Sequence, residues 1–185
     1  MSLSSEHIKT LKSKSASKIG TAGMADTAGV TRPNVWEIFA NTSKDSYGVF
    51  FEMRPVDRAG LIKSGAPASL LTRIAKDMDF PRDRVARLIG VPPATANRKL
   101  AKNANLSNDE SERLVGLTKL IGQVEDIVLE SGDSTNFEPA KWFSSWIQTP
   151  MQALGGRKPE EFLDTSDGRE AVASLLAQMQ SGAYA

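Results

Sequence analysis

Residues 153–168 read ALGGRKPEEFLDTSDG, and paired glycines beside an Arg-Lys pair are components of phosphate-binding loops. A P-loop needs Gly-x-x-x-x-Gly-Lys-Ser/Thr between a strand and a helix, so that backbone N–H groups and the lysine converge on the phosphates. Here Gly155 and Gly156 are adjacent, no strand pattern precedes them, and Pro159 follows the lysine. The stretch therefore predicts a sharp corner, in which the glycines adopt positive φ and the proline begins the next helix.

Few other side chains in the sequence can do acid–base, nucleophilic or metal chemistry. The chain has no cysteine, which excludes disulfides, thiolate nucleophiles and cysteine zinc sites. Its one histidine, His7, lies in a polar leader, which argues against catalytic triads and histidine metal sites. Glu160 and Glu161 follow the corner, and their simplest role is to compensate a helix dipole. We therefore expect no enzyme activity, no metal and no cofactor.

Charge is distributed unevenly along the chain. Residues 54–104 hold 11 basic and 4 acidic side chains, a net charge of +7, whereas residues 105–185 hold 6 basic and 13 acidic ones, a net charge of −7. A basic middle suits a polyanionic partner, although a solvated charged surface is an alternative that charge alone does not exclude. The chain lacks an apolar run of the ~20 residues that span a bilayer. It also lacks a secretory signal, so we expect a cytoplasmic protein.

Hydrophobic periodicity predicts an all-α protein behind a flexible N-terminal arm. The arm is expected over residues 1–33, which are rich in Ser, Ala, Gly, Thr and Lys. Residues 34–43 fit a short helix, and residues 47–54 a short strand or a buried connector. Further helices are predicted over residues 56–65 and 67–78, and two short ones within 81–102. A long helix is predicted to start at a Ser107–Glu110 capping box, and three more are predicted over 136–150, 159–163 and about 167–180.

The best-defined motif is a helix-turn-helix over residues 82–102, in which Gly90 ends the first helix and Ala96 and Leu100 face inward from the second. The side chains left to face outward on the second helix are Thr95, Asn97, Arg98, Lys99 and Lys102. Arginine and asparagine can make bidentate contacts with guanine and adenine edges. Phosphate contacts are expected from Arg82, Arg84, Arg87 and Lys102. An ordinary helical hairpin is the alternative, but the coincident basic block favours DNA binding.

Two apolar features complete the pattern. Trp142 and Trp146 lie one helical turn apart and are expected in the core rather than in a cofactor stack, with one of them half exposed as an interface anchor. In the last helix, an inward stripe is predicted from Val172, Leu175, Leu176 and Met179.

From about Leu61 to its end, the chain resembles the antitoxins of RES/Xre-type toxin–antitoxin systems, the group that includes ParS and MbcA. The resemblance rests on RVARLIGVPPATANRKLAKNANLSNDESERL and on W…TPMQALGGRKPEEFLDTSDGREAVASLLAQMQSGAYA. The second block is the more specific, because its order of Trp, Thr-Pro, Ala-Leu-Gly-Gly, Pro, Leu-Asp-Thr and Gly is hard to match by chance. The chain departs from the pattern at VPPAT, where two prolines replace the usual polar residues of the turn, and at Asn97, where a bulkier side chain is common.

The resemblance implies an Xre-like helix-turn-helix domain, expected over residues 46–104, and a small helical toxin-binding domain, expected over 105–185. It does not cover the leader, and we expect residues 1–45 to form a flexible or partly ordered arm. Such antitoxins neutralise a toxin that consumes NAD⁺ by covering its active site, and many repress their own operon. By position, Thr95, Arg98 and Lys99 match the recognition helix. The toxin-binding block is matched by Trp146, Gly155, Gly156, Pro159, Leu163, Asp164, Thr165 and Gly168.

We therefore expect a homodimeric antitoxin with two partners, a RES-like toxin and operator double-stranded DNA. Exposed Arg157 and Lys158 are expected to dock at the rim of the toxin. Met179 and Tyr184, at the end of the last helix and in the tail, are expected to reach toward the toxin's pocket. A stand-alone transcriptional regulator without a toxin partner is the alternative.

Overall fold

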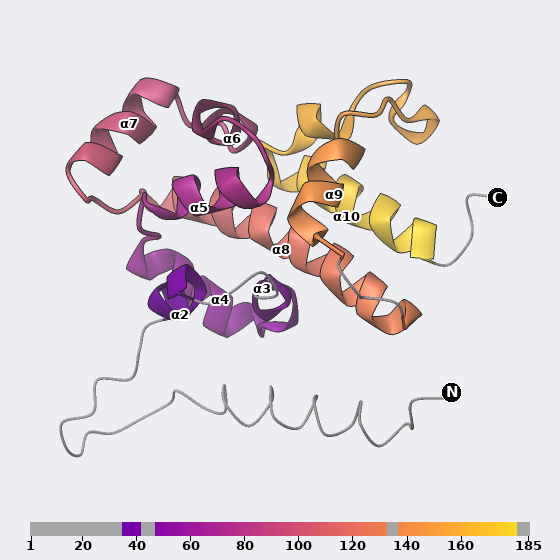
Figure 1. The fold of residues 1–185 in the computed structure, drawn as a ribbon, viewed down its shortest axis with the longest axis horizontal. Coiled ribbons are helices and arrows are strands. Elements are labelled where there is room, and N and C mark those ends of the chain that lie inside the picture. The colour runs from indigo at the N-terminus through magenta and orange to yellow at the C-terminus, as the bar shows by residue number, and fades with distance from the viewer. Residues whose placement is uncertain (1–34, 42–46, 133–136, 181–185) are drawn as a thin grey trace, which may run out of the picture. The chain divides into compact units, whose positions relative to one another are not determined.

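The computed structural model describes residues 35–41, 47–132 and 137–180, which all belong to the second of the chain's two units (Figure 1). The described residues form helices, and two isolated β-bridges join Pro67 to Asn105 and Met151 to Arg157. The predicted all-α fold is confirmed. The predicted arm over residues 1–33 lies outside the described residues. No helix in the described ranges is long and apolar enough to cross a membrane.

The helices agree with most of the predicted segments. In chain order they are α2 (Val35–Asn41), α3 (Gly48–Glu52), α4 (Pro55–Ser64), α5 (Leu70–Asp77), α6 (Arg82–Leu88), α7 (Pro93–Ala101), α8 (Asn108–Ser131), α9 (Pro139–Trp146), the 3₁₀ helices η1 (Gln152–Leu154) and η2 (Pro159–Phe162), and α10 (Ser166–Gln180).

Two predictions of secondary structure were wrong in detail. Residues 47–54 contain the short helix α3 and not a strand, because the segment packs across α8 and buries Phe50 completely. The helix expected from Pro67 begins only at Leu70. The preceding residues pair with the chain before α8, where the backbone N–H of Ala68 donates to the carbonyl of Ala104 at 3.2 Å.

Helix α8 lies between α3 and α4 on one side and α9 and α10 on the other (Figure 1). Its start is the predicted capping box: the Ser107 N–H donates to Glu110 Oε2 at 2.7 Å, and the Glu110 N–H donates to Ser107 Oγ at 3.3 Å. The helix is buried around most of its circumference, including the polar residues Thr118, Gln123 and Glu125. It therefore forms the centre of the fold rather than one amphipathic wall.

Two glycines of α8 allow its neighbours to approach the helix backbone. A Cβ at Gly122 would collide with the carbonyl oxygen of Tyr47, just before α3. A Cβ at Gly116 would collide with the side chain of Arg169, which crosses α8 from α10. The same α3 contact is completed by Glu125, whose carboxylate accepts a hydrogen bond from the Gly48 N–H at 2.8 Å.

The helix-turn-helix is formed by α6 and α7 and packs on α5. Gly90 adopts φ of 62° in the turn, and Val91 is buried between the helices as a plug. Pro92 is the N-cap of α7 with φ of −58°, and Pro93 is its first residue, a position that suits proline. The proline pair that departs from the family pattern is thus compatible with the motif's backbone.

The predicted corner is also confirmed. Gly155 and Gly156 have φ of 65° and 79°, and buried Pro159 starts η2. At the end of this segment, the Gly168 N–H donates to Thr165 Oγ1 at 3.1 Å as α10 begins. A Cβ at Gly168 would collide with the carbonyl oxygen of Phe162, which explains the glycine in the first turn of that helix.

We predict that Gly122→Ala destabilises the protein strongly. The added methyl meets backbone atoms of Tyr47 and Gly48 rather than a flexible side chain, so overpacking should cost at least about 1–3 kcal/mol. The matched control is Gly60→Ala on exposed α4, where nothing lies within 4 Å of the added Cβ. This control should stabilise by about 0.5–1 kcal/mol. Urea unfolding of both variants tests the pair, and equal effects would contradict the close approach.

We predict that Glu110 makes part of the stability depend on pH. Burial raises the pKa of the Glu110 carboxyl, but hydrogen bonds from Lys99 and Ser107 outweigh burial and hold this pKa below its ordinary value. A lowered pKa in the folded state adds stability at neutral pH that is lost as the pH falls through the acidic range. Glu110→Gln should therefore lower Tm at pH 7, with a difference from wild type that shrinks toward pH 3. A difference independent of pH would rule out this contribution.

Candidate functional site

Some of the predicted DNA-binding side chains form hydrogen bonds or ion pairs within the protein, and others do not. Arg98 and Lys102 of the α7 segment are exposed, and neither side chain forms a hydrogen bond or ion pair with another residue of the described ranges. Arg87 on α6 is exposed as well, and Thr95 is half-buried. These side chains are available to an external partner without loss of an internal contact.

Asn97 instead links the two helices of the motif. Its Oδ1 accepts a hydrogen bond from Arg82 Nη2 at 3.0 Å, and its Nδ2 donates to Asp83 Oδ1 at 3.4 Å. Both ends of the amide are thus engaged by α6. The sequence placed Asn97 and Arg82 on the outer surface correctly, but it gave no sign that they contact each other.

Lys99 is occupied by α8. Its ammonium group donates to Glu110 Oε2 at 2.7 Å and to the carbonyl of Asn105 at 3.2 Å, and its side chain is only 20% exposed. The same carboxylate completes the capping box of α8. Lys99 therefore fixes the angle between α7 and α8, a role that its predicted place on the recognition face did not indicate.

Arg84, expected to contact phosphates, reaches the C-terminal part of the chain. Its Nη2 donates to Glu160 Oε2 at 2.7 Å and to Gln148 Oε1 at 2.9 Å. Its guanidinium also lies 4.0 Å from the ring centroid of Phe80. This side chain thus ties α6 to the end of α9 and to η2. Sequence reasoning missed the contact because the partners are 64 and 76 residues away.

A second contact joins the same two parts of the protein. A Cβ built on Gly90, in the turn of the helix-turn-helix, would lie 3.3 Å from Cβ of Asp164. Close by, the buried guanidinium of Arg169 donates to the carbonyl of Leu163 at 3.0 Å, and its burial lowers the pKa of that side chain. The segment around 163–169 is therefore packed against both the turn and α8.

The corner before η2 carries the two cations expected to meet a partner. Arg157 and Lys158 are exposed, as predicted. Each also has an internal carboxylate: Arg157 Nε lies 3.1 Å from Glu161 Oε2, and Lys158 Nζ lies 3.8 Å from Glu160 Oε1. The Arg157 guanidinium additionally stacks over the Phe162 ring at 4.4 Å. The corner is an ion-paired surface rather than a pair of free cations.

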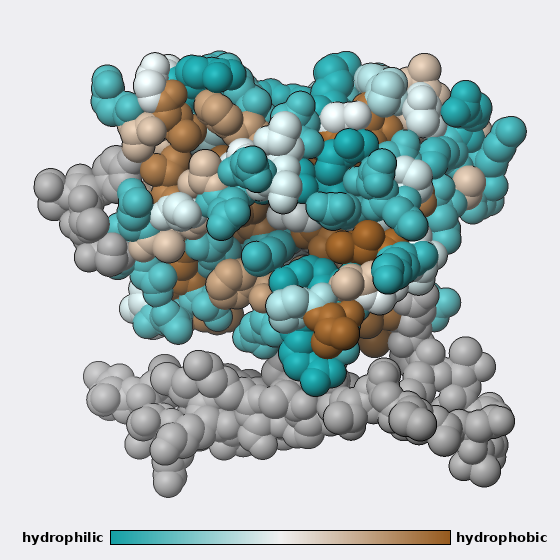
Figure 2. Space-filling view, turned by 180° about the vertical axis from the view of Figure 1, so that it is seen from behind, coloured by the Kyte–Doolittle hydropathy of each residue, from teal (hydrophilic) through white to brown (hydrophobic). Residues whose placement is uncertain are grey.

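Apolar side chains are exposed at the other end of this domain. Met179 near the end of α10 is 42% exposed, against the prediction that it faces inward, and Leu129 near the end of α8 is 58% exposed. The two helix ends are joined by Gln180, whose Nε2 donates to Glu130 Oε2 at 2.7 Å. We call Leu129 and Met179 the distal apolar pair. The face of the molecule shown in Figure 2 is mainly hydrophilic, and its hydrophobic side chains form small, separate patches.

The tryptophans behave largely as expected. Trp146 is 9% exposed and belongs to the core, whereas Trp142 is half-buried and stacks on it with ring centroids 5.9 Å apart. The half-exposed member of the pair is thus Trp142. Tyr184, which was expected to reach a partner's pocket, lies outside the described residues.

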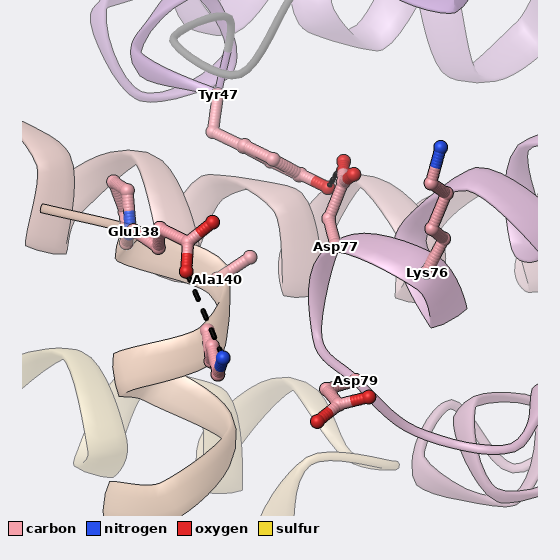
Figure 3. Close-up of a pocket in the computed structure, with 8 residues that line it drawn as sticks. Tyr47, Lys76, Asp77, Asp79, Glu138 and Ala140 are labelled. Atoms are coloured by element: carbon pink, nitrogen blue, oxygen red, sulfur yellow. Dashed lines mark hydrogen bonds and ion pairs between the residues drawn. The ribbon is translucent and has the colours of Figure 1, made fainter. Parts of the chain in front are cut away.

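A polar cleft lies between the start of α9 and the residues around α5 (Figure 3). The Tyr47 hydroxyl points at Asp77 and donates to its carboxylate at 2.7 Å, and burial, aided by that carboxylate, raises the pKa of Tyr47 above its ordinary value. The phenol therefore holds the segment before α3 in place and is not available as a base. Among the described residues, no three His, Cys, Asp or Glu side chains cluster in a way that could hold a metal ion.

Comparison with known proteins identifies two domains in this chain, one at the helix-turn-helix and one at the C-terminal helices. Residues 57–119 match the antitoxin Xre-like helix-turn-helix domain, and residues 127–182 match the antitoxin Xre/MbcA/ParS C-terminal toxin-binding domain. The chain is also 43% identical over 140 residues to the Prs ADP-ribosylating antitoxin of Sphingobium sp. (strain YBL2), covering 76% of this chain and 88% of that protein. The two matches divide within α8, so this helix contributes to both domains. The chain belongs to the Xre/MbcA/ParS family and is the antitoxin of a toxin–antitoxin system.

Proposed function

We propose that this antitoxin inhibits a RES-like, NAD⁺-consuming toxin by covering its active site, and that it binds operator DNA to repress its own gene. The observation that carries the first part is the match of residues 127–182 to a toxin-binding domain. The relative's name contains the words "ADP-ribosylating", and ADP-ribosylation uses NAD⁺ as its donor, which supports an NAD⁺-consuming toxin. The antitoxin acts by binding and needs no cofactor of its own.

The distal apolar pair is the best-supported anchor for the toxin. Leu129 and Met179 are large and exposed, and each directly precedes one member of the Glu130–Gln180 hydrogen bond between two helix ends of the matched domain. Central interface anchors are commonly large apolar side chains surrounded by polar ones. The net charge of −7 over residues 105–185 also suits a site that binds the pyrophosphate of NAD⁺ with cations.

DNA binding is assigned to the face formed by α6 and α7. Arg87, Arg98 and Lys102 are the exposed cations of this face without an internal partner in the described ranges. A dimer places two such faces on successive half-sites of an operator, which is the usual arrangement of this motif. We leave Arg84 and Lys99 out of the DNA-facing set, because contact with DNA would break their ion pairs with Glu160 and Glu110.

The alternative of a stand-alone regulator differs in one testable respect: it needs no toxin. The match to a toxin-binding domain favours the antitoxin. Co-expression with the toxin-like gene expected beside its own should rescue growth and keep cellular NAD⁺ high. Full rescue by a chain ending at Gln148, which lacks the corner, η2 and α10, would contradict the proposed role of the C-terminal domain.

We predict that Met179→Glu weakens toxin binding at least about tenfold, because an interface would have to bury an unpaired carboxylate. The control is Val56→Glu on α4, a 68% exposed apolar residue outside the matched toxin-binding domain. Val56→Glu should bind and neutralise the toxin as wild type does. Calorimetric titration of the toxin with each variant checks this. Unchanged affinity of Met179→Glu would exclude the distal apolar pair from the interface.

We predict that DNA binding weakens steeply with salt, and that two basic residues differ in their share of this effect. Lys102→Ala should reduce the slope of log K against log salt by about 1, the effect of losing one phosphate contact. Arg84→Ala should leave the slope unchanged but lower Tm, because it breaks the link to Glu160 and Gln148. Anisotropy titrations on the upstream DNA at several salt concentrations test both. A smaller slope for Arg84→Ala would show that Arg84 contacts phosphate.

A further inference from the structure

One face of α7 is open and carries a single long side chain along the helix. Ala94, Arg98 and Ala101 are all exposed, and their spacing of four and three residues places them on one side of the helix. The alanines project only a methyl group on either side of Arg98. A helix with this face can lie close to the floor of a major groove, since nothing but the arginine has to fit between the backbone and the base edges.

The other polar residues of α7 are less able to read a base. Asn97 would need both ends of its amide to recognise an adenine, but these ends already contact Arg82 and Asp83. Lys99 is held by Glu110. Lys102 is the C-cap of the helix, whereas base contacts of this motif come from the N-terminal part of the recognition helix. Arg98 lies in the last turn of α7, one turn closer to the N-terminus than Lys102, and it can contact a base without breaking an internal bond.

Because α7 starts with two prolines, its contacts with α6 matter more for its orientation. Pro92 and Pro93 have no backbone N–H, and the N–H groups of Thr95 and Ala96 both donate to the Pro92 carbonyl, at 2.9 and 3.0 Å. The helix therefore offers few backbone donors with which to grip a phosphate at its N-terminus. Its orientation depends on side chains, and Asn97 adds hydrogen bonds to α6 to the packing around buried Val91.

We propose that Arg98 reads a guanine in the major groove and that Asn97 is a positioning residue that sets the angle between α6 and α7. The inference rests on the proposed DNA binding and goes beyond it by assigning these two neighbours different tasks. Arginine recognises guanine through bidentate hydrogen bonds to O6 and N7. An operator half-site should accordingly contain one guanine whose replacement is tolerated only when Arg98 is absent.

The test uses the full-length chain and a pool of randomised DNA duplexes. Wild type should enrich a site with one dominant guanine per half-site, and replacing that base by 7-deazaguanine, which lacks N7, should weaken binding. Arg98→Ala should bind the selected duplex about tenfold or more weakly, as expected for one lost bidentate contact, and should be insensitive to 7-deazaguanine.

Asn97→Ala is the matched comparison. It should weaken binding to selected and unselected duplexes alike, while retaining the preference for guanine over 7-deazaguanine. In double-mutant cycles, Arg82→Ala and Asn97→Ala should be strongly non-additive in DNA affinity, whereas Arg82→Ala and Arg98→Ala should be additive. Asn97→Gln should not retain wild-type DNA affinity, because the longer amide cannot keep both contacts with α6.

Four results would overturn the inference. Arg98→Ala could keep the guanine preference, or Asn97→Ala could lose a preference for a particular adenine; either assigns base reading to another side chain. Wild type could also bind duplexes without enriching any sequence, which removes base reading but leaves DNA binding in place. Absence of any binding by wild type at low salt would contradict the proposed DNA function as well, and would leave toxin inhibition unaffected.

Discussion

The fold depends on how closely other segments approach helix α8. Two glycines on this helix, Gly116 and Gly122, leave room for the Arg169 side chain on one side and for the backbone at Tyr47 on another. Because every residue from 114 to 125 is buried or half-buried, this middle part of α8 has no free face on which a replacement contact could form. Helices α3, α4, α9 and α10 pack directly on this element, and Lys99 joins α7 to its first turn.

The same packing makes the antitoxin's two domains parts of one structure. Arg84 joins the first helix of the motif to Glu160 and Gln148, and Gly90 lies against Asp164. The two family matches end at residue 119 and begin at residue 127, both within α8, so this helix contributes to both domains. Arg84 of the basic block thus serves the contact between the two parts of the chain.

Local signals in the sequence predicted local structure well. The Ser107–Glu110 capping box, Gly90 in the turn and the glycine pair at the corner each act within a few residues, and all were confirmed. Contacts between distant residues were not predictable in this way. The period of α10 placed Met179 inward, but its side chain is 42% exposed. Nothing near Arg84 in the sequence indicated a carboxylate 76 residues away.

The central claim is that the C-terminal domain blocks the active site of an NAD⁺-consuming toxin. The most direct measurement is NAD⁺ consumption by the purified toxin encoded beside this gene, titrated with the full-length antitoxin. The account predicts that consumption stops near one antitoxin chain per toxin active site. A stable complex in which the toxin still consumes NAD⁺ at its original rate would contradict it.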